Sequence, residues 1–392
     1  MTRIDGSVLI AGIGYSEVAR STGRSEGSLA IEACRNAIED SGLPRTAIDG
    51  IAVWPDRVSS VFEGPSITYM QRALGLSRPR YWQAFGTGPA QLASLVGAIN
   101  AIAVGAADVV ICYRAHLRQE QRFWAPGAGS GGTDNAPATA ESAYRVPYGV
   151  PAGAPRFALW AARHAYEYGT TDEHRGALVL TCREHAQLNP RAVWYGHPLT
   201  MEDYLASDLI ASPLRILDCD MPVDGAVAII LARSDRAPDL RSRPVAVQSV
   251  GHAGGATLDN ELWPDMTVMA AKYAADEMWA GTSLRAADLD VAQVYDGFSS
   301  LAISWLEGLG IVGMGEAGPW LLEGHGRLGG RLPICTDGGQ LGGGRLHGFG
   351  KVAESVRQLR GECGQRQVPN AQVAVSCAGG GPMATAMLLT AG

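Results

Sequence analysis

The sequence predicts an α/β protein made of two similar halves. Apolar runs of strand length alternate with segments that carry apolar residues at helical spacing, a pattern typical of a parallel or mixed sheet covered on both faces. The chain of 392 residues is longer than one typical domain, which favours two core units or a duplicated one. Both halves close on an apolar strand, AVAIILA at 226–232 and ATAMLLT at 384–390, and their similar order of elements indicates an internal duplication.

The first half is expected to begin with a strand and a helix. SVLIAGIGYSE at 7–17 predicts a buried strand, and the helix that follows carries an apolar face from Ser28 and stops at Gly42. The later expected elements are the strand IDGIAVW at 48–54, the apolar helix GPAQLASLVGAINAIAVGAA at 88–107, the buried strand DVVICYRA at 108–115, and the turn and strand RILDCDMPVDGAVAIILARSDRA at 215–237. Between the last two, the Gly-, Ala- and Pro-rich stretch at 121–142 lacks periodicity, which predicts a lid or a binding region.

The second half is expected to repeat this alternation. Its elements are the strand PVAVQSVGHAGG at 244–255, a helix near 267–278, the strand and helix DVAQVYDGFSSLAISWLEGLG at 290–310, and two strands joined by a glycine turn, QVAVSCAGGGPMATAMLLTAG, at 372–392. We therefore divide the chain into a first half at 1–113, a loop or lid insertion at 114–212, the closing strands of the first half at 213–243, and a second half at 244–392.

Composition argues against several classes of function. A net charge of −7 with interspersed signs gives no basic stripe for nucleic acid. No apolar run approaches the roughly 20 residues of a membrane span, and no cleavage site follows the N-terminal apolar run, so we expect a cytoplasmic protein. The seven cysteines form no CxxC pair, which argues against a disulfide framework and a zinc knuckle.

Metal and cofactor motifs are also not expected. The spacing of His164 and His174 matches no standard metal set, and a solvated helix face explains both residues better. GIGYSE begins like a dinucleotide fingerprint, but Glu17 at the third glycine position would repel a pyrophosphate. We expect neither a metal nor a cofactor.

Three stretches of the second half place reactive side chains beside glycine-rich backbone. They are VYDGFSS at 294–300, CTDGGQLGGGRLHGFG at 335–350 and SCAGGGP at 376–382. Each follows a predicted strand, and open α/β sheets bind ligands at the carboxyl ends of their strands. Glycine turns can hold an oxyanion, while Tyr295, Asp296, His347 and Cys377 can supply acid–base or nucleophilic chemistry. Alternatively, the glycines only permit tight turns and Cys377 is a small buried hydrophobe.

With these motifs the chain resembles the thiolase superfamily over nearly its whole length. The similar features are the opening GIGYSEVARSTGRSEGSLAIEA, the segment IAVGAADVVICYRA, the junction ILDCDMPVDGAVAIILA, the VYDGF and GGQLGGGRLHG loops, and the terminal CAGGGPMATAMLL. The chain resembles the lipid-transfer-protein or sterol carrier protein thiolase-like group, and its opening and YDGF motif look closest to actinobacterial aldolases that shorten steroid side chains. The resemblance implies a thiolase fold, with duplicated βαβαβαββ halves in a five-layered αβαβα arrangement and a lid insertion.

The resemblance also assigns expected roles, residue by residue. A thiolase carries its nucleophilic cysteine in a C-x-S-G turn that reads FGTG here, so Phe85 replaces the thiol beside Gly86 and no acyl-enzyme can form there. The asparagine of the family's N-E-A-F loop is Tyr295, and the histidine of its G-H-P loop falls on Arg345. His347 lies two residues further on.

Other family positions are retained. The acid–base cysteine of the C-x-GGG loop is Cys377. The glycines Gly339, Gly379 and Gly380 are expected to contact substrate, the last two by stabilising an oxyanion. Asp296 is expected either to orient Tyr295 or to cap the helix that begins near Phe298.

The implied activity is a retro-aldol cleavage that needs no nucleophile. A β-hydroxyacyl-CoA, with a steroid or other branched side chain, would give a ketone and a shorter acyl-CoA. Tyr295 would act at the hydroxyl group, and its pKa of ~10 requires help from a cation, for which Arg345 is a candidate. Cys377 or His347 would protonate the enolate.

Two alternatives remain. One is a catalytically inactive carrier or scaffold that binds acyl-CoA or sterol, and the other is an acyltransferase that uses a different cysteine, such as Cys112 or Cys335. The expected partners are an acyl-CoA thioester, with coenzyme A only as part of the substrate, and a second copy of the chain in a homodimer. The resemblance adds a small zinc-ribbon/OB-fold protein that would complete a heterotetramer.

Overall fold

The computed structural model describes residues 4–54, 65–84, 92–118, 143, 146–150, 153–255 and 265–392. Phe85 and Gly86, which the sequence placed at the site, lie outside these described residues. Within them, no helix is both long and apolar enough to cross a membrane.

The predicted strands and helices occur in the expected order, together with elements that the sequence did not predict, among them helices at Ala154–Tyr168, Asp172–Ala186 and Phe349–Arg360. The helices are α1 (Glu26–Ser41), α2 (Ile67–Leu74), α3 (Ala93–Ala103), α4 (Ala154–Tyr168), α5 (Asp172–Ala186), α6 (Met201–Ala206), α7 (Ala270–Ala280), α8 (Ser299–Gly308), α9 (Ala317–Leu322) and α10 (Phe349–Arg360). The strands are β1 (Val8–Tyr15), β2 (Gly50–Val53), β3 (Tyr81–Ala84), β4 (Val109–His116), β5 (Leu209–Ala211), β6 (Leu214–Arg215), β7 (Gly225–Arg233), β8 (Val245–Gly254), β9 (Val291–Gln293), β10 (Val373–Gly379) and β11 (Met383–Ala391).

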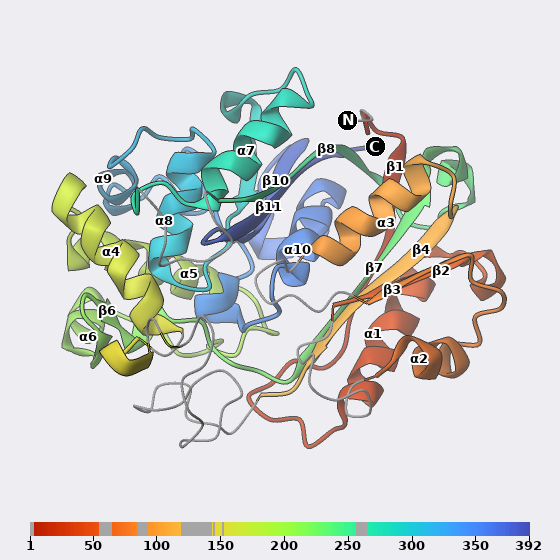
Figure 1. Ribbon diagram of the computed structural model, residues 1–392, viewed down its shortest axis with the longest axis horizontal. Coiled ribbons are helices and arrows are strands. Elements are labelled where there is room, and N and C mark those ends of the chain that lie inside the picture. Colours follow the sequence, from red (N-terminus) through yellow and green to blue (C-terminus); the bar gives the residue numbers. More distant parts are fainter. Residues whose placement is uncertain are drawn as a thin grey trace.

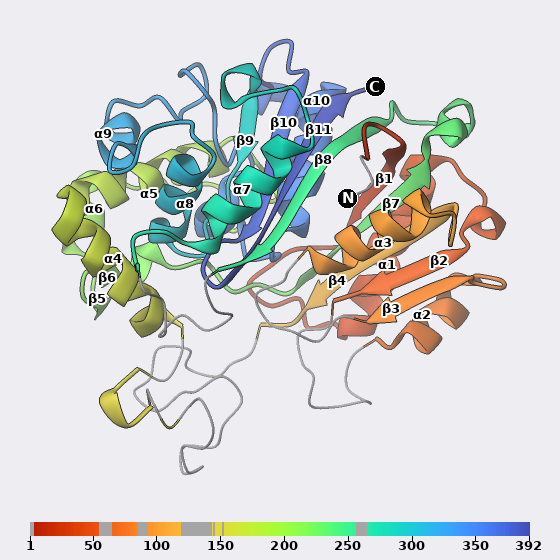
Figure 2. The ribbon, with the colours of Figure 1, turned by 45° about the horizontal axis from the view of Figure 1, so that its top comes forward.

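The main sheet of the described residues has nine strands, and its pairing repeats in the two halves. The order is β3-β2-β4-β7-β1-β8-β11-β10-β9, which Figure 2 shows as one curved sheet. In the first half β2 pairs parallel with β4, and β4, β7 and β1 then pair antiparallel. In the second half β9 pairs parallel with β10, and β10, β11 and β8 pair antiparallel. β1 and β8 pair antiparallel and so join the two halves. The same pairing pattern in both halves is the duplicated arrangement that the sequence predicts.

The layers follow from where the apolar side chains point. Alternate residues of β4 and β7 face two different cores, one shared with α1 and α2 and the other with α3 and α10. Figure 1 shows the resulting five layers, with α7 outside the second half, α3 and α10 between the halves, and α1 and α2 outside the first. This is the predicted αβαβα arrangement.

Glycine allows α1 to lie directly on β1. A Cβ on Gly14 would lie 2.2 Å from the carbonyl oxygen of Ala33, and one on Gly12 would lie 2.4 Å from that of Ala37. The helix then ends where expected, because Gly42 takes a left-handed conformation with φ of 72°. These contacts explain the glycines of GIGYSE as packing residues.

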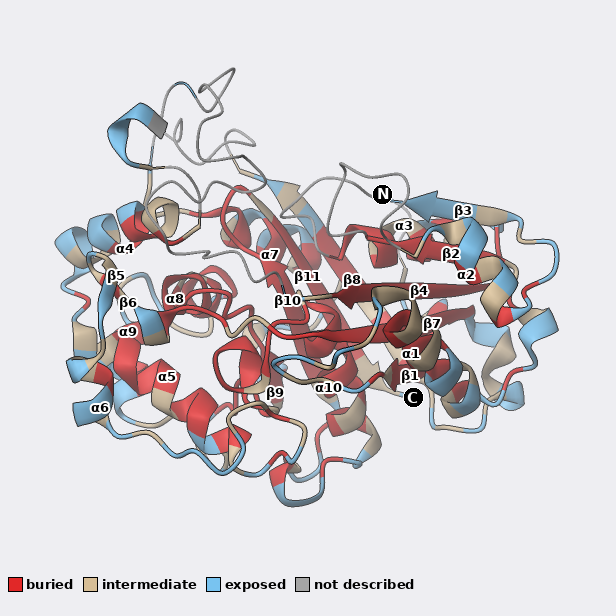
Figure 3. Ribbon diagram, turned by 90° about the horizontal axis from the view of Figure 1, so that it is seen from below, coloured by how far each residue is buried: buried red, intermediate tan, exposed pale blue. Residues whose placement is uncertain are grey.

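The strands that carry the candidate site are buried, whereas the sheet edge at β3 is exposed. Figure 3 shows this contrast between the central strands and β3. The helices α4, α5, α8 and α9 form a separate group beside the second half (Figure 1). The site described next lies where loops from both halves meet this group.

Candidate active site

Three loops meet at the carboxyl ends of the second-half strands. The backbone N–H of Asp220 donates to the Gly297 carbonyl at 3.1 Å, and that of Met221 donates to the Gln340 carbonyl at 3.0 Å. The N–H of Arg345 donates back to the Met221 carbonyl at 2.8 Å. The DCDMP turn at 218–222 therefore joins the YDGF and GGQLGGGR loops.

Arg345 is buried in this junction beside a carboxylate. Its Nη1 lies 3.5 Å from Oδ1 of Asp220, and its Nη2 donates to Nε2 of His116 at 3.2 Å. Burial raises the pKa of Asp220 to about 6, Arg345 opposes this rise, and Asp296 adds to it. Asp220 is thus an acidic group that changes charge just below neutral pH, next to a permanent cation.

His347 has a defined tautomer. Its Nδ1 lies 3.0 Å from Nη2 of Arg114, and because a guanidinium only donates, Nδ1 is the acceptor and the proton of the neutral ring lies on Nε2. The ring also packs edge-on against Trp54 and His116, with centroid separations of 5.3 and 5.2 Å. Arg114, Trp54 and His116 thus fix the tautomer and the orientation of the His347 ring.

Tyr295 folds back over its own loop. A Cβ on Gly297 would lie 2.6 Å from Cε1 and 3.3 Å from the hydroxyl oxygen of Tyr295, so only glycine fits under the ring. The same Gly297 accepts the backbone hydrogen bond from Asp220. Tyr295 and Asp220 thus both adjoin this glycine, and Tyr295 is only 4% exposed.

Asp296 does not serve the helix as expected. The N-cap of α8 is Phe298, with no side-chain cap, so the capping alternative is wrong. Oδ2 of Asp296 instead accepts from the backbone N–H groups of Gln340 and Leu341 at 2.8 and 3.2 Å. Oδ1 lies 2.5 Å from the ammonium of Lys351, a buried ion pair that holds the glycine loop in place.

A group of thiols surrounds this ion pair. The Lys351 ammonium donates to Sγ of Cys335 at 3.1 Å, and Sγ of Cys182 lies 3.6 Å from Oδ2 of Asp296. Cys182, Asp296 and Cys335 are close enough together to hold a metal ion, with ligand atoms within 4.8 Å of one another. However, the ammonium already contacts two of the three, and its positive charge disfavours a cation there.

Cys377 is suited to donate a proton. It is completely buried, and burial raises its pKa well above the usual value, with Cys335 adding to the rise and Lys351 opposing it. The thiol is therefore protonated at neutral pH. The loop that carries Cys377 lies against the loop at 335–350, since a Cβ on Gly348 would lie 2.6 Å from Cβ of Ala378.

Two of the glycines have their N–H groups occupied. The N–H of Gly380 donates to the Met383 carbonyl at 2.9 Å, and that of Gly339 donates to Oδ1 of Asp337 at 2.8 Å. These two N–H groups are therefore engaged within the protein. Gly379 lies at the end of β10 with φ of 69°, and its carbonyl accepts from Nε1 of Trp305 at 3.0 Å.

Sequence reasoning missed Asp220, His116 and Lys351. Asp220 lies in an aspartate-rich turn that was interpreted only as a junction, because nothing local shows that it meets Arg345. Lys351 could have been noticed in the sequence, because it is one of only two lysines in a chain with 32 Lys and Arg residues.

The sequence interpretation of His164 also needs correction. Its side chain is 12% exposed and pairs with Glu307 at 2.9 Å, so the solvated-face interpretation is wrong for this residue.

The duplicated five-layered fold and its three glycine loops define a protein of the thiolase class. Residues 256–391 match the family described as Thiolase C-terminal domain-like. The chain is 36% identical to 17-hydroxy-3-oxo-4-pregnene-20-carboxyl-CoA lyase from Mycobacterium tuberculosis, over 91% of this chain and 92% of the relative. It is 33% identical to the steroid side-chain-cleaving aldolase from Thermomonospora curvata, over 92% of each. The chain belongs to the thiolase superfamily and, within it, to the family of these aldolases.

Solved structures agree with this assignment. The Ltp2-ChsH2(DUF35) aldolase has a TM-score of 0.88 and 32% sequence identity, covering 99% of this chain and 98% of its own. Human mitochondrial 3-ketoacyl-CoA thiolase has a TM-score of 0.70 and 14% identity, covering 100% of both chains. The second likeness concerns the fold alone.

Proposed function

We propose that this chain is an aldolase that cleaves the Cα–Cβ bond of a β-hydroxyacyl-CoA, with a steroid or another branched side chain. The observation that carries the proposal is that Asp220, paired with Arg345, donates its backbone N–H to Gly297, the glycine beneath the Tyr295 ring. The relatives of the chain are a 17-hydroxy-3-oxo-4-pregnene-20-carboxyl-CoA lyase and a steroid side-chain-cleaving aldolase. The substrate hydroxyl loses its proton, a ketone forms at Cβ, and the electrons of the broken bond pass to the thioester as an enolate. Protonation of Cα then gives the shorter acyl-CoA.

The residues of the junction divide these steps. In this proposal Tyr295 accepts the hydroxyl proton, and Asp220, whose backbone adjoins the same Gly297, is the carboxylate that takes up the proton of the phenol. Arg345 holds Asp220 in place and favours negative charge nearby. Cys377 or the Nε2–H of His347 protonates the enolate. An oxyanion site at the SCAGGGP loop, as the sequence predicts, would stabilise the enolate oxygen by about 3 kcal/mol for each N–H donor.

An acyltransferase based on another cysteine has less support. All seven cysteines are buried, and burial raises the pKa of Cys112, which makes its thiolate scarce. Cys335 is also fully buried. Phe85, outside the described residues, keeps its proposed place where a thiolase has its nucleophile.

The test uses turnover of a branched β-hydroxyacyl-CoA, followed by mass spectrometry of both products. Wild-type protein should release a ketone and a shorter acyl-CoA, and Tyr295→Phe should reduce kcat by roughly 10²- to 10⁴-fold. Tyr113→Phe is the matched control, because Tyr113 is also buried and its hydroxyl donates to the Pro65 carbonyl at 2.8 Å, away from the loops. Its turnover should remain normal.

Two results would reject the proposal. An acyl group trapped on any cysteine would support the acyltransferase instead. Thermal stabilisation by CoA esters without turnover, alone or with a partner protein, would support the carrier. Near-normal activity of Tyr295→Phe would remove Tyr295 from the mechanism.

We also propose two assemblies. The chain would form a homodimer through β3, the edge strand of the described sheet in the first half, where Trp82 is 65% exposed. A small zinc-ribbon/OB-fold protein would complete a heterotetramer, in keeping with the two-protein name of the Ltp2-ChsH2(DUF35) aldolase.

A further inference from the structure

Gln340, in the glycine loop at 338–344, is hydrogen-bonded to several parts of the candidate active site. Its backbone N–H donates to Oδ2 of Asp296, in the YDGF loop, at 2.8 Å. Its backbone carbonyl accepts from the N–H of Met221, in the DCDMP turn, at 3.0 Å. Its side-chain oxygen Oε1 accepts from the backbone N–H of His347 at 3.0 Å. These contacts place Gln340 inside the site, where the loops meet.

The loop that carries Gln340 is held firmly against α5. A Cβ on Gly338 would lie 2.8 Å from Cβ of Ala186, and one on Gly342 would lie 2.8 Å from the carbonyl oxygen of Cys182. Residues Gly339–Gly343 form a π-helical turn, a rare backbone conformation that is frequent at functional sites. The side chain of Gln340 therefore projects from a fixed backbone.

The side-chain amide of Gln340 has a defined orientation and two unused donors. Because the backbone N–H of His347 only donates, the atom that it meets is the oxygen of the amide, and Nε2 is the other end. Gln340 is 3% exposed, and its Nε2 has no hydrogen-bond partner among the described residues. Buried donors without an acceptor are rare and cost free energy, which a bound acceptor removes.

The amide lies beside the part of the loop that adjoins Cys377. Its oxygen is bonded to His347, and the next residue, Gly348, would place a Cβ 2.6 Å from Cβ of Ala378. Ala378 directly follows Cys377 in the chain. In the proposed function, Cys377 or His347 protonates the enolate, so the acceptor closest to this end of the site is the thioester oxygen.

An enolate oxygen at this place needs hydrogen-bond donors, and one of the donors that the sequence predicts is already used. The N–H of Gly380 donates to the Met383 carbonyl at 2.9 Å. Side-chain amides supply the same stabilisation as backbone N–H groups when they are fixed in advance. Gln340 meets this requirement, because its other polar atoms are engaged and its backbone is held.

We propose that the Nε2 amide of Gln340 donates a hydrogen bond to the thioester oxygen of the substrate and holds this oxygen while it becomes the enolate oxygen. The inference rests on the proposed function and deepens it, because it assigns a further catalytic residue to the same reaction. Gln340 transfers no proton. The hydrogen bond strengthens as negative charge reaches the oxygen during cleavage of the Cα–Cβ bond, and it weakens again when Cα is protonated.

The first test measures binding without turnover. Two CoA derivatives with the same steroid side chain and no β-hydroxyl are compared by titration calorimetry with the full-length chain. One is the thioester, and the other is the thioether in which a CH₂ group replaces the carbonyl. Wild-type protein should bind the thioester about fivefold more tightly. Gln340→Met, which has no N–H donor, should reduce this preference to about twofold or less and should bind the thioether as wild type does.

A second variant and a control complete the binding test. Gln340→Glu keeps an oxygen that can accept from His347 but lacks the amide donors, so it replaces Gln340→Met if that variant fails to fold, and it should lose the preference in the same way. Gln248→Met is the matched control. Gln248 lies on β8, and its amide donates to the hydroxyl of Thr390 at 2.7 Å, at the end of β11 remote from the glycine turn. Its preference should equal that of wild type.

Turnover then tests the role in catalysis. With a branched β-hydroxyacyl-CoA, Gln340→Met should reduce kcat by roughly 10²- to 10³-fold, because the hydrogen bond is strongest in the transition state. The value of KM should rise by only several-fold, about as much as the affinity for the thioester falls.

The outcomes separate the role of Gln340 from the proposed function. A thioester preference that is unchanged in the folded variants, an equal loss of affinity for both ligands, or a near-normal kcat would overturn the role of Gln340 and leave the proposed aldolase intact. Wild-type protein that binds neither ligand and cleaves no β-hydroxyacyl-CoA would overturn both.

Discussion

At the scale of single residues, Asp220 should give the enzyme its dependence on pH. Burial raises its pKa from near 3.8 to about 6, and the proposed mechanism needs it as the carboxylate. The value of kcat/KM should therefore fall as pH decreases through about 6, and Asp220→Asn should lose both most of its activity and this acid limb. A pH profile of kcat/KM for wild type and for Asp220→Asn measures the acid limb. Asp224→Asn is the control, since Asp224 lies two residues beyond this turn and accepts from the backbone N–H groups of Thr22 and Arg118. A limb that persists in Asp220→Asn would exclude Asp220 as the titrating group.

The same carboxyl should cost stability when it ionises. A folded-state pKa above the unfolded one means that the folded protein binds the proton more tightly, so this group's contribution to stability falls as pH rises from about 4 to about 6. The loss amounts to up to about 3 kcal/mol. Asp220→Asn lacks this titration, so its free energy of unfolding relative to wild type should improve between pH 4 and pH 7.5. Denaturant titrations at pH 4 and pH 7.5 measure the free energy of unfolding of both proteins. A difference between them that is the same at the two pH values would contradict the raised pKa of Asp220.

At the scale of elements, the loop at 338–344 depends on close contact between Gly339 and Asp296. A Cβ on Gly339 would lie 2.0 Å from Oδ2 of Asp296, and its φ is +65°. Gly339→Ala should therefore destabilise the fold by about 3 kcal/mol or more, because it disturbs the buried pair of Asp296 and Lys351. Gly329→Ala is the matched control, with φ of +81° and no atom within 4 Å, and it should cost only about 1 kcal/mol. Denaturant titrations compare the free energies of unfolding of the two variants. If both variants lose the same stability, backbone conformation alone accounts for the destabilisation.

The elements also show what the sequence could predict. The strands and helices could be predicted because apolar residues recur in a regular local pattern, as in DVVICYRA, which forms β4. The glycine stretches could be predicted from their composition, and those at 294–300 and 376–382 adjoin β9 and β10 as expected. The stretch at 335–350 follows α9 and an isolated bridge at Ile334, so the strand expected before it is wrong. The pairing of Asp220 with Arg345 could not be predicted. The two residues are 125 positions apart, and a local pattern carries no information on which loops meet. The ion pair of Asp296 with the ammonium of Lys351 could not be predicted for the same reason, because Lys351 lies 55 positions further along the chain.

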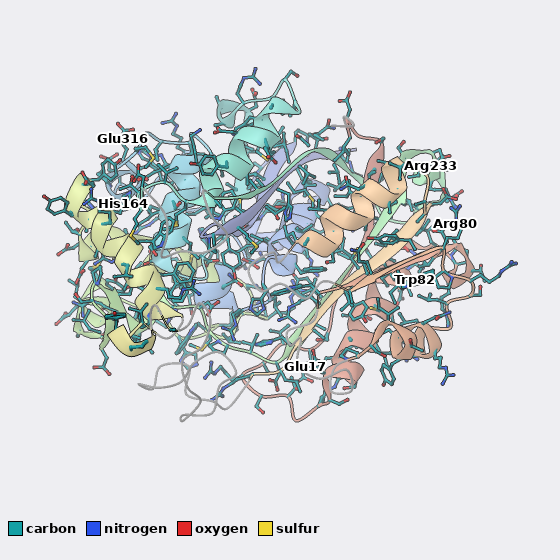
Figure 4. All side chains as sticks on the ribbon, viewed as in Figure 1. Glu17, Arg80, Trp82, His164, Arg233 and Glu316 are labelled. Carbon is teal, nitrogen blue, oxygen red and sulfur yellow. The ribbon has the colours of Figure 1, made fainter. Side chains whose placement is uncertain are left out.

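At the scale of the whole molecule, the described sheet ends at β3 in a surface suited to a second copy. β3 pairs on one side with β2, and Figure 4 labels Trp82 beside the exposed edge. Exposed edge strands bearing large apolar residues pair readily with other chains, and a lysine on such a strand opposes this. Trp82→Lys should therefore convert the proposed homodimer into a monomer, measured by sedimentation velocity. Tyr166→Lys should leave the dimer unchanged, because Tyr166 is 81% exposed on α4, which lies on the opposite side of the molecule from β3 (Figures 1 and 2). A Trp82→Lys protein that still sediments as a dimer would place the interface elsewhere.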